Sequence, residues 1–110
     1  MDLSASLEKL LAEGRDSATL RFALGTEYLK QDQCELAIRH LSAAVQMDPA
    51  YSAAWKQLGK AQAAQGLPQA AKDSYARGIA VALERGDEQA AREMRVFLRR
   101  LAGAAEERQD

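Results

Sequence analysis

The sequence repeats itself at one fixed interval, and no other feature restricts the possible folds as strongly. The segment 54–78 aligns with the segment 20–44. We call the spacing between equivalent positions, such as Leu24 and Leu58, the repeat interval. Large apolar residues and small residues recur in the same slots of the two segments: Leu24 and Leu58, Gly25 and Gly59, Ala37 and Ala71, Leu41 and Tyr75, and Ala44 and Gly78. A repeat of this length is one supersecondary unit that cannot bury its apolar face alone, so neighbouring copies stack around a continuous core. The sequence therefore predicts two stacked repeat units.

The repeated residues also resemble a known family. Trp55, the Leu58-Gly59 pair, Ala71 and Tyr75 follow one another in the order typical of tetratricopeptide repeats. The chain resembles a small bacterial-type protein of that family with two repeats and flanking helices. The resemblance implies an all-α fold, an antiparallel helix-hairpin stack that forms a right-handed superhelix with a C-terminal capping helix. It also implies a binding module, without naming the ligand.

The composition fits one helical domain. The chain has 110 residues, only 5% of them aromatic, and Ala, Leu, Gln, Glu and Arg are abundant. Ala and straight-chain residues lose the least freedom on entering a helix, and a chain this short usually has one core. We therefore expect a single domain over residues 1–110, with an N-terminal helix at 4–13, repeats at 18–51 and 52–85, and a capping helix at 87–107.

Charge and cysteine usage restrict the partner and the compartment. The formal net charge is -1, with acidic and basic residues interspersed, so no overall field draws the protein toward nucleic acid or anionic lipid. Cys34 is the single cysteine, which excludes an intramolecular disulfide and suits a reducing compartment. The N-terminus has no basic leader before an apolar run, and no window approaches the roughly 18 apolar residues of a membrane helix. We expect a soluble, cytoplasmic protein without a membrane or nucleic-acid partner.

The N-terminal helix has two possible positions. Leu7 and Leu10 lie on one face, one repeat interval before Leu41 and Ala44. This register matches the second helix of the first repeat. The segment 4–13 therefore either covers the end of the stack, like the remnant of a preceding repeat, or folds back into the binding groove. We favour the first position.

The C-terminal segment is too short for a third repeat. It resembles the solvating last helix that closes stacks of this kind. The expected register is a slip of two residues from the repeat interval, which places Ala91, Met94 and Leu98 in the slots of Trp55, Leu58 and Gln62. Because the second repeat lacks the Asp-Pro ending of the first, its last helix should run to Glu84 or Arg85.

No arrangement in the sequence is typical of a catalytic or metal site. Catalysis requires a nucleophile beside a base, or convergent carboxylates. His40 is the single histidine and lies six residues from Cys34, a spacing that puts the two side chains on different faces of one helix. We expect a surface or half-buried His40 and an inert structural Cys34. The protein is predicted not to be an enzyme and to need no cofactor or metal ion.

The family resemblance implies a peptide-binding groove on the concave side, along the first helix of each repeat. The residues of the first repeat that would face the groove are Thr19, Phe22, Thr26, Leu29 and Lys30. Those of the second repeat are Ala53, Lys56, Lys60 and Ala63, with Gln57 and Ala64 beside them. If the last helix stands in for a third first helix, Arg92 and Arg99 continue the same wall. The groove would be apolar at one end and cationic at the other, which favours an acidic partner.

The leading hypothesis is a non-enzymatic protein–protein interaction module that binds a peptide or a partner helix in this groove. Exposed lysines and arginines are ordinary on any surface, so the charge pattern alone does not establish a site. The alternative is a self-associating structural protein, so the chain is expected to be a monomer or a weak homodimer. RNA binding through the arginines of the last helix is a third hypothesis, against which the near-neutral charge and Glu93 argue. The slots that clamp heat-shock chaperone C-termini in this family hold Phe22, Thr26 and Gln57 here, so chaperone binding is not predicted.

Overall fold

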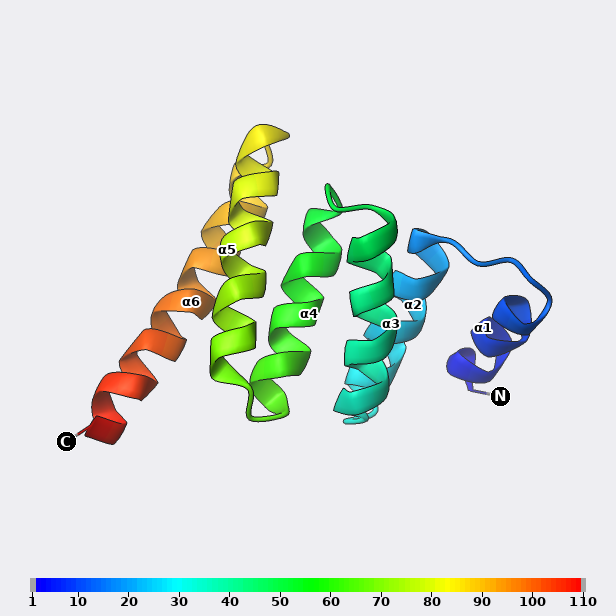
Figure 1. Ribbon diagram of the computed structural model, residues 1–110, viewed down its shortest axis with the longest axis horizontal. Helices are drawn as coiled ribbons and strands as arrows, with labels where there is room; N and C mark the ends of the chain where they lie inside the picture. The colour runs from blue at the N-terminus through cyan, green and yellow to red at the C-terminus, as the bar shows by residue number, and fades with distance from the viewer. Residues whose placement is uncertain (1, 110) are drawn as a thin grey trace.

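The computed structural model describes residues 2–109 of the chain, with side chains for residues 2–104. The described chain is built from helices joined by short turns, and no strand occurs in it (Figure 1). The helices are α1 (Leu3–Ala12), α2 (Ala18–Lys30), α3 (Cys34–Met47), α4 (Ser52–Ala64), α5 (Pro68–Glu84) and α6 (Glu88–Gln109). The predicted all-α fold is confirmed. The first predicted repeat contains α2 and α3, and the second contains α4 and α5.

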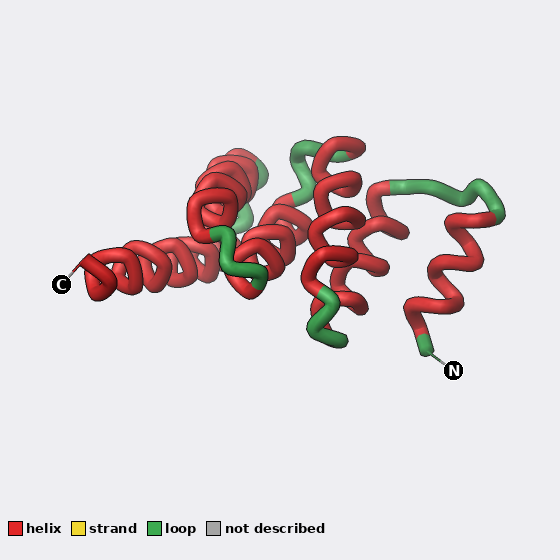
Figure 2. Tube along the Cα trace, turned by 60° about the horizontal axis from the view of Figure 1, so that its bottom comes forward, coloured by secondary structure: helices red, strands yellow, loops and turns green. Residues whose placement is uncertain are grey.

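Helices that are neighbours in the sequence are also neighbours in space. The pairs α2–α3 and α4–α5 form hairpins. Helix α3 packs against α4, which joins the two hairpins, and α5 packs against the single helix α6. Figure 2 shows the helices following one another from α1 at one end to α6 at the other, over a longest extent of 50 Å. In addition α2 packs against α4, and α4 against α6. These three helices therefore share one side of the molecule, which we call the first-helix face.

Glycine is required where the paired helices cross. A Cβ atom added to Gly59 would lie 2.5 Å from the Tyr75 ring, and one added to Gly25 would collide with Leu41. Both partner side chains are fully or almost fully buried, so they have no room to move. The recurring Leu-Gly pair is thus explained by close packing inside each hairpin. The side chain that fills the space belongs to the second helix of the same repeat.

Helices α1 and α2 begin where the sequence supplies a capping side chain. Asp2 accepts a hydrogen bond from the Ser4 N–H at 3.2 Å, and Ser17 accepts one from the Leu20 N–H at 3.0 Å. These bonds satisfy backbone donors that have no partner within a helix. Asp32 takes a positive φ of 59° in the slot that Gly66 occupies at 84° one repeat later, and both allow the tight turn inside a hairpin.

The N-terminal helix covers the end of the stack. It begins and ends one residue earlier than predicted, and it packs against α2 (Figure 1). Within the described chain it does not pack against α4 or α6, so it lies outside the first-helix face. Helix α1 thus lies where the remnant of a preceding repeat would lie, and not in the groove.

The C-terminal helix has the register predicted from the two-residue slip. Helix α4 begins one repeat interval after α2, whereas α6 begins two positions later than that interval would place it after α4. The reason is that α5 has 17 residues and α3 has 14, while the turn after α5 is shorter than the turn after α3. Ala91 and Met94 are fully buried in the predicted slots, although Leu98 is only half-buried. In this register Arg95 occupies the slot that Gly25 and Gly59 occupy in the two repeats. Those glycines let the second helix of each repeat pack closely, and the long side chain of Arg95 prevents such packing on α6. Helix α6 therefore ends the stack with a polar outer surface.

Candidate functional site

The predicted groove residues come from helices of the first-helix face, with different degrees of exposure. Phe22, Thr26 and Leu29 on α2 and Lys56 on α4 are half-buried. Lys30, Lys60, Arg92 and Arg99 are exposed. Phe22 and Leu29 also pack against the hydrophobic core, so only part of their apolar surface is available to a ligand.

An aromatic pair lies at the α2 end of this face. The rings of Phe22 and Tyr51 are 4.9 Å apart between centroids and are tilted by 35°. Tyr51 immediately precedes α4, so the pair joins the first helices of the two repeats. Also on α2, the Thr26 hydroxyl oxygen is buried and has no hydrogen-bond partner among the described residues. Tyr51 was not among the predicted groove residues, because it lies in a turn outside the helical periodicity.

Two of the predicted cations are paired with carboxylates. Nζ of Lys30 lies 3.2 Å from Oε1 of Glu27 on the same helix. Nζ of Lys56 donates to Oε2 of Glu93 at 2.9 Å, linking α4 to α6. The hydrogen bond from Lys56 is the main cause that lowers the pKa of Glu93, which therefore stays ionised. Lys56 was predicted to face a cationic groove, but the carboxylate of Glu93 offsets its charge.

The Lys56–Glu93 pair borders a pocket between the first halves of α4 and α6. The pocket has a volume of about 270 Å³. Its lining is mostly small or polar: Ser52, Ala53, Lys56, Asp87, Gln89, Ala90 and Glu93. Because it holds one lysine and two carboxylates, this pocket is not the cationic end that the sequence predicted.

A second group of cations lies further along α4 and α6. Nζ of Lys60 is 5.7 Å from the centre of the Phe97 ring, and Cζ of Arg100 is 5.8 Å from the same point. Neither side chain forms an ion pair with a described residue. Lys60 was predicted to face the groove, but Phe97 and Arg100 were missed. Lys60 lies in the same slot one repeat after Thr26, and only the packing of α6 brings Phe97 and Arg100 beside it.

Arg92 and Arg99 are exposed on α6, and no described interaction connects either of them to α4. In the observed register Arg92 occupies the slot of Lys56 and Arg99 that of Ala63. They thus stay candidates for the wall of the groove. The structure brings Glu93 to Lys56 and Phe97 to Lys60, whereas no described interaction joins Arg92 or Arg99 to either lysine.

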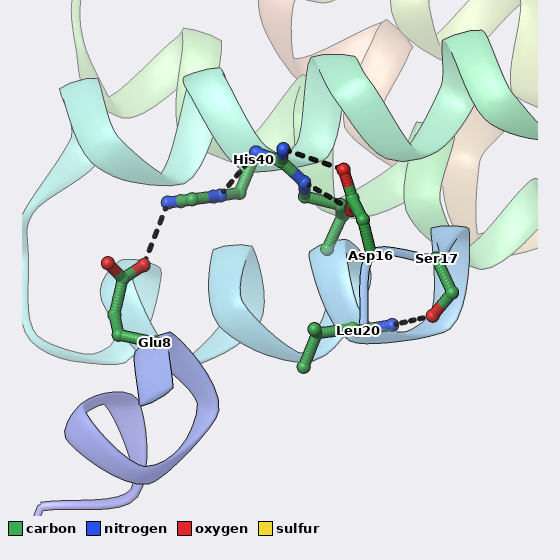
Figure 3. A network of polar contacts seen from close by, with 6 residues as sticks. Glu8, Asp16, Ser17, Leu20 and His40 are labelled. Carbon is green, nitrogen blue, oxygen red and sulfur yellow. Dashed lines mark hydrogen bonds and ion pairs between the residues drawn. The ribbon is translucent and has the colours of Figure 1, made fainter. Parts of the chain in front are cut away.

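A polar network fixes the opposite end of the stack (Figure 3). Nε2 of His40 lies 3.3 Å from Oε1 of Glu8 on α1, and Nδ1 lies 3.2 Å from Nη1 of Arg21 on α2. Arg21 in turn donates to both carboxylate oxygens of Asp16, at 2.8 and 3.0 Å. Since arginine can only donate, Nδ1 of His40 accepts and Nε2 carries the hydrogen that faces Glu8. The network ties α1, α2 and α3 together.

His40 is therefore buried, with 5% of its surface exposed, and not on the surface or half-buried as predicted. The Tyr28 ring stacks on it at 5.6 Å, and α1 lies over it. Burial is the main cause that lowers the pKa of His40, with smaller contributions from Arg21 and Arg39, while Glu8 and Asp16 act in the opposite direction. Across the described chain no three His, Cys, Asp or Glu side chains are grouped so that they could hold a metal ion.

No described helix combines the length and the apolar character needed to cross a lipid bilayer. No protein-family model matches the sequence. The chain is 50% identical over 95 residues to the TPR repeat-containing protein PA0015 of Pseudomonas aeruginosa, a match that covers 86% of this chain and 90% of that protein.

Solved structures give the same result. The solution structure of protein BPP2914 from Bordetella parapertussis superposes with a TM-score of 0.83 at 44% identity, over 94% of this chain and 90% of that one. The crystal structure of a tetratricopeptide repeat domain protein from Salinibacter ruber superposes with a TM-score of 0.74 at 31% identity, over 80% of this chain and 99% of that one. The internal repeat, the glycines at the helix crossings and these relatives agree, and the chain belongs to the tetratricopeptide repeat family.

Proposed function

We propose that the protein binds an acidic segment of a partner protein along its first-helix face. Repeats of this family generally serve as protein-interaction modules, and the described chain is built on that fold. The observation that carries the proposal is the division of this face into an aromatic end and a cationic end. Phe22 and Tyr51 form the first, and Lys60 and Arg100 beside Phe97 form the second.

The proposed groove lies along α2, α4 and α6. Its residues are Phe22, Thr26, Leu29, Lys30, Lys56, Lys60, Arg92 and Arg99, to which we add Tyr51, Phe97 and Arg100. An apolar side chain of the ligand packs near Phe22, and an acidic side chain lies near Lys60. Lys30 and Lys56 contribute less to attraction, because Glu27 and Glu93 already offset their charges. An extended peptide or an amphipathic helix meets these requirements.

The groove is tested by affinity capture of partner proteins from an extract of the native cell, with variants that are matched in charge. Lys60→Glu reverses a charge on the first-helix face, and Arg39→Glu reverses one on α3, outside that face. We expect the wild type and Arg39→Glu to retain the same proteins, and Lys60→Glu and Phe22→Ala to lose them. Equal retention by all four proteins would show that binding does not use this face.

Self-association has less support. Among the residues whose side chains are described, the large apolar ones that stay exposed are Leu3, Met47, Leu67 and Leu83. They come from four different places: the start of α1, the end of α3, the α4–α5 turn and the end of α5. We therefore propose a monomer, which sedimentation over a range of concentrations checks. A mass that rises toward that of a dimer would favour the structural alternative.

A further inference from the structure

Two cations from different helices approach one aromatic ring on the first-helix face. Lys60 comes from α4, while Phe97 and Arg100 come from α6. Both cationic groups lie close to the ring centre, at 5.7 and 5.8 Å. At such distances the ring attracts each cation electrostatically. The Phe97 ring is thus shared by two cationic groups that come from different helices.

No carboxylate of the described residues is in ion-pair contact with either charge, that of Lys60 or that of Arg100. Glu93 on the same face is not available, because Lys56 donates to its Oε2 at 2.9 Å and Gln89 donates to its Oε1 at 3.3 Å. Lys60 makes a smaller contribution than Lys56 to the lowered pKa of Glu93, so this carboxylate offsets part of its charge. Two cations beside one ring repel each other, and an anion in contact with both would relieve that repulsion.

The base of this region is fixed, while the two charged ends are free to adjust. The Phe97 ring is half-buried and stacks on the buried Tyr75 ring at 5.6 Å. Lys60 and Arg100 are exposed, so each has room to turn its charged group toward a ligand. A rigid apolar floor between two adjustable donors suits a side chain that has both methylene groups and a negative charge.

We propose that Lys60, Phe97 and Arg100 form a subsite for a glutamate side chain of the bound segment. The guanidinium of Arg100 offers paired donors that match a carboxylate, the ammonium of Lys60 adds a further donor, and the methylene groups of the glutamate pack on Phe97. This inference rests on the proposed function, because it names the residue type that the cationic end of the groove selects.

The test is a titration of the ¹⁵N-labelled chain of 110 residues, followed by NMR. The probe is a blocked hexapeptide of alternating leucine and glutamate, and its counterpart has glutamine in place of glutamate. We expect saturable shifts of the amides of Lys60, Phe97 and Arg100 with the first peptide only. Lys60→Gln and Arg100→Gln should each weaken binding about fivefold, the upper range for one exposed charge pair. Arg95→Gln removes an equal charge from the outer side of α6 and should leave the affinity unchanged.

The outcomes separate this inference from the proposed function. Shifts confined to α2, or affinities that are the same in Lys60→Gln, Arg100→Gln and Arg95→Gln, would overturn the subsite but keep binding on the first-helix face. Shifts nowhere on that face would overturn both. Since the two variants replace exposed side chains, spectra with the dispersion of the wild type are expected and show that each variant is folded.

Discussion

Lys56 of α4 and Glu93 of α6 form an ion pair 2.9 Å long that connects the last repeat to the capping helix. The two residues lie in different structural units, and 37 positions separate them in the sequence. The pair has two consequences. It links α6 to α4, and it offsets the charge of one lysine on the first-helix face.

The pair should contribute little to stability. The two side chains retain 24% and 42% of their exposure, so solvent screens much of the attraction. We expect Lys56→Gln to lower the free energy of unfolding by only about 0.2–1 kcal/mol, measured by urea denaturation. Lys72→Gln, on α5, is the control and should have no effect. A loss well above this range would mean that the pair organises the α4–α6 packing.

Met94 should contribute far more to the stability of the fold than an exposed methionine does. Its side chain is fully buried in the space beside Gly78, whereas Met47 at the end of α3 is 48% exposed. Met94→Ala should cost about 2–5 kcal/mol, since it leaves a cavity between α5 and α6. Met47→Ala should change stability by no more than about 0.5 kcal/mol. Thermal or urea unfolding of both variants checks this, and similar values would contradict the observed position of α6.

Two glycines should respond in opposite ways to the same substitution. In Gly59→Ala the new methyl group meets the buried Tyr75 ring at 2.5 Å, and we expect a loss of about 1–3 kcal/mol from overpacking. Gly103 lies within α6 with nothing within 4 Å of its Cβ position. Gly103→Ala should therefore stabilise the protein by up to about 1 kcal/mol through helix propensity. Equal effects in the two variants would exclude the close crossing of α4 and α5.

Stability should fall as the pH is lowered through the range in which His40 titrates in the unfolded chain. Burial lowers the pKa of His40 in the folded protein below the ordinary 6.5. The unfolded state therefore binds the proton first, and the stabilising contribution is full above pH 6.5 and is lost below it. The lowered pKa values of Asp2, Asp16 and Glu93 influence stability only under more acidic conditions.

The measurement is the free energy of unfolding at pH 7.5 and at pH 5.5. His40 is the single histidine of the chain, so the difference between the two values should shrink in His40→Gln. That variant is also expected to be less stable at pH 7.5, because Gln cannot reproduce both the stack on Tyr28 and the contact with Glu8. A wild type that is equally stable at both values would contradict the burial of an unprotonated His40.

The sequence by itself determined the fold. The repeat interval, the Leu-Gly pairs and the capping residues act locally or between adjacent helices, so they predict helices, hairpins and the order of the stack without further information. The predicted slip of two residues placed Ala91 and Met94 correctly on the buried face of α6. The apolar residues of a buried face recur with the helical period, so this face can be recognised in the sequence of the helix itself. The predicted position of α1 follows from the same register.

Only the tertiary structure decided the charges and the burial of the polar residues. Helical periodicity gives the side of a helix on which Lys56, Lys60 and His40 lie, but not what faces them from another helix. What faces them depends on how far one helix is shifted along its neighbour and on the length of the side chains. The greater length of α5 sets this shift for α6. Glu93 thus neutralises Lys56, Phe97 and Arg100 lie beside Lys60, and α1 buries His40. Such pairings arise from packing between segments distant in sequence, which no local pattern contains.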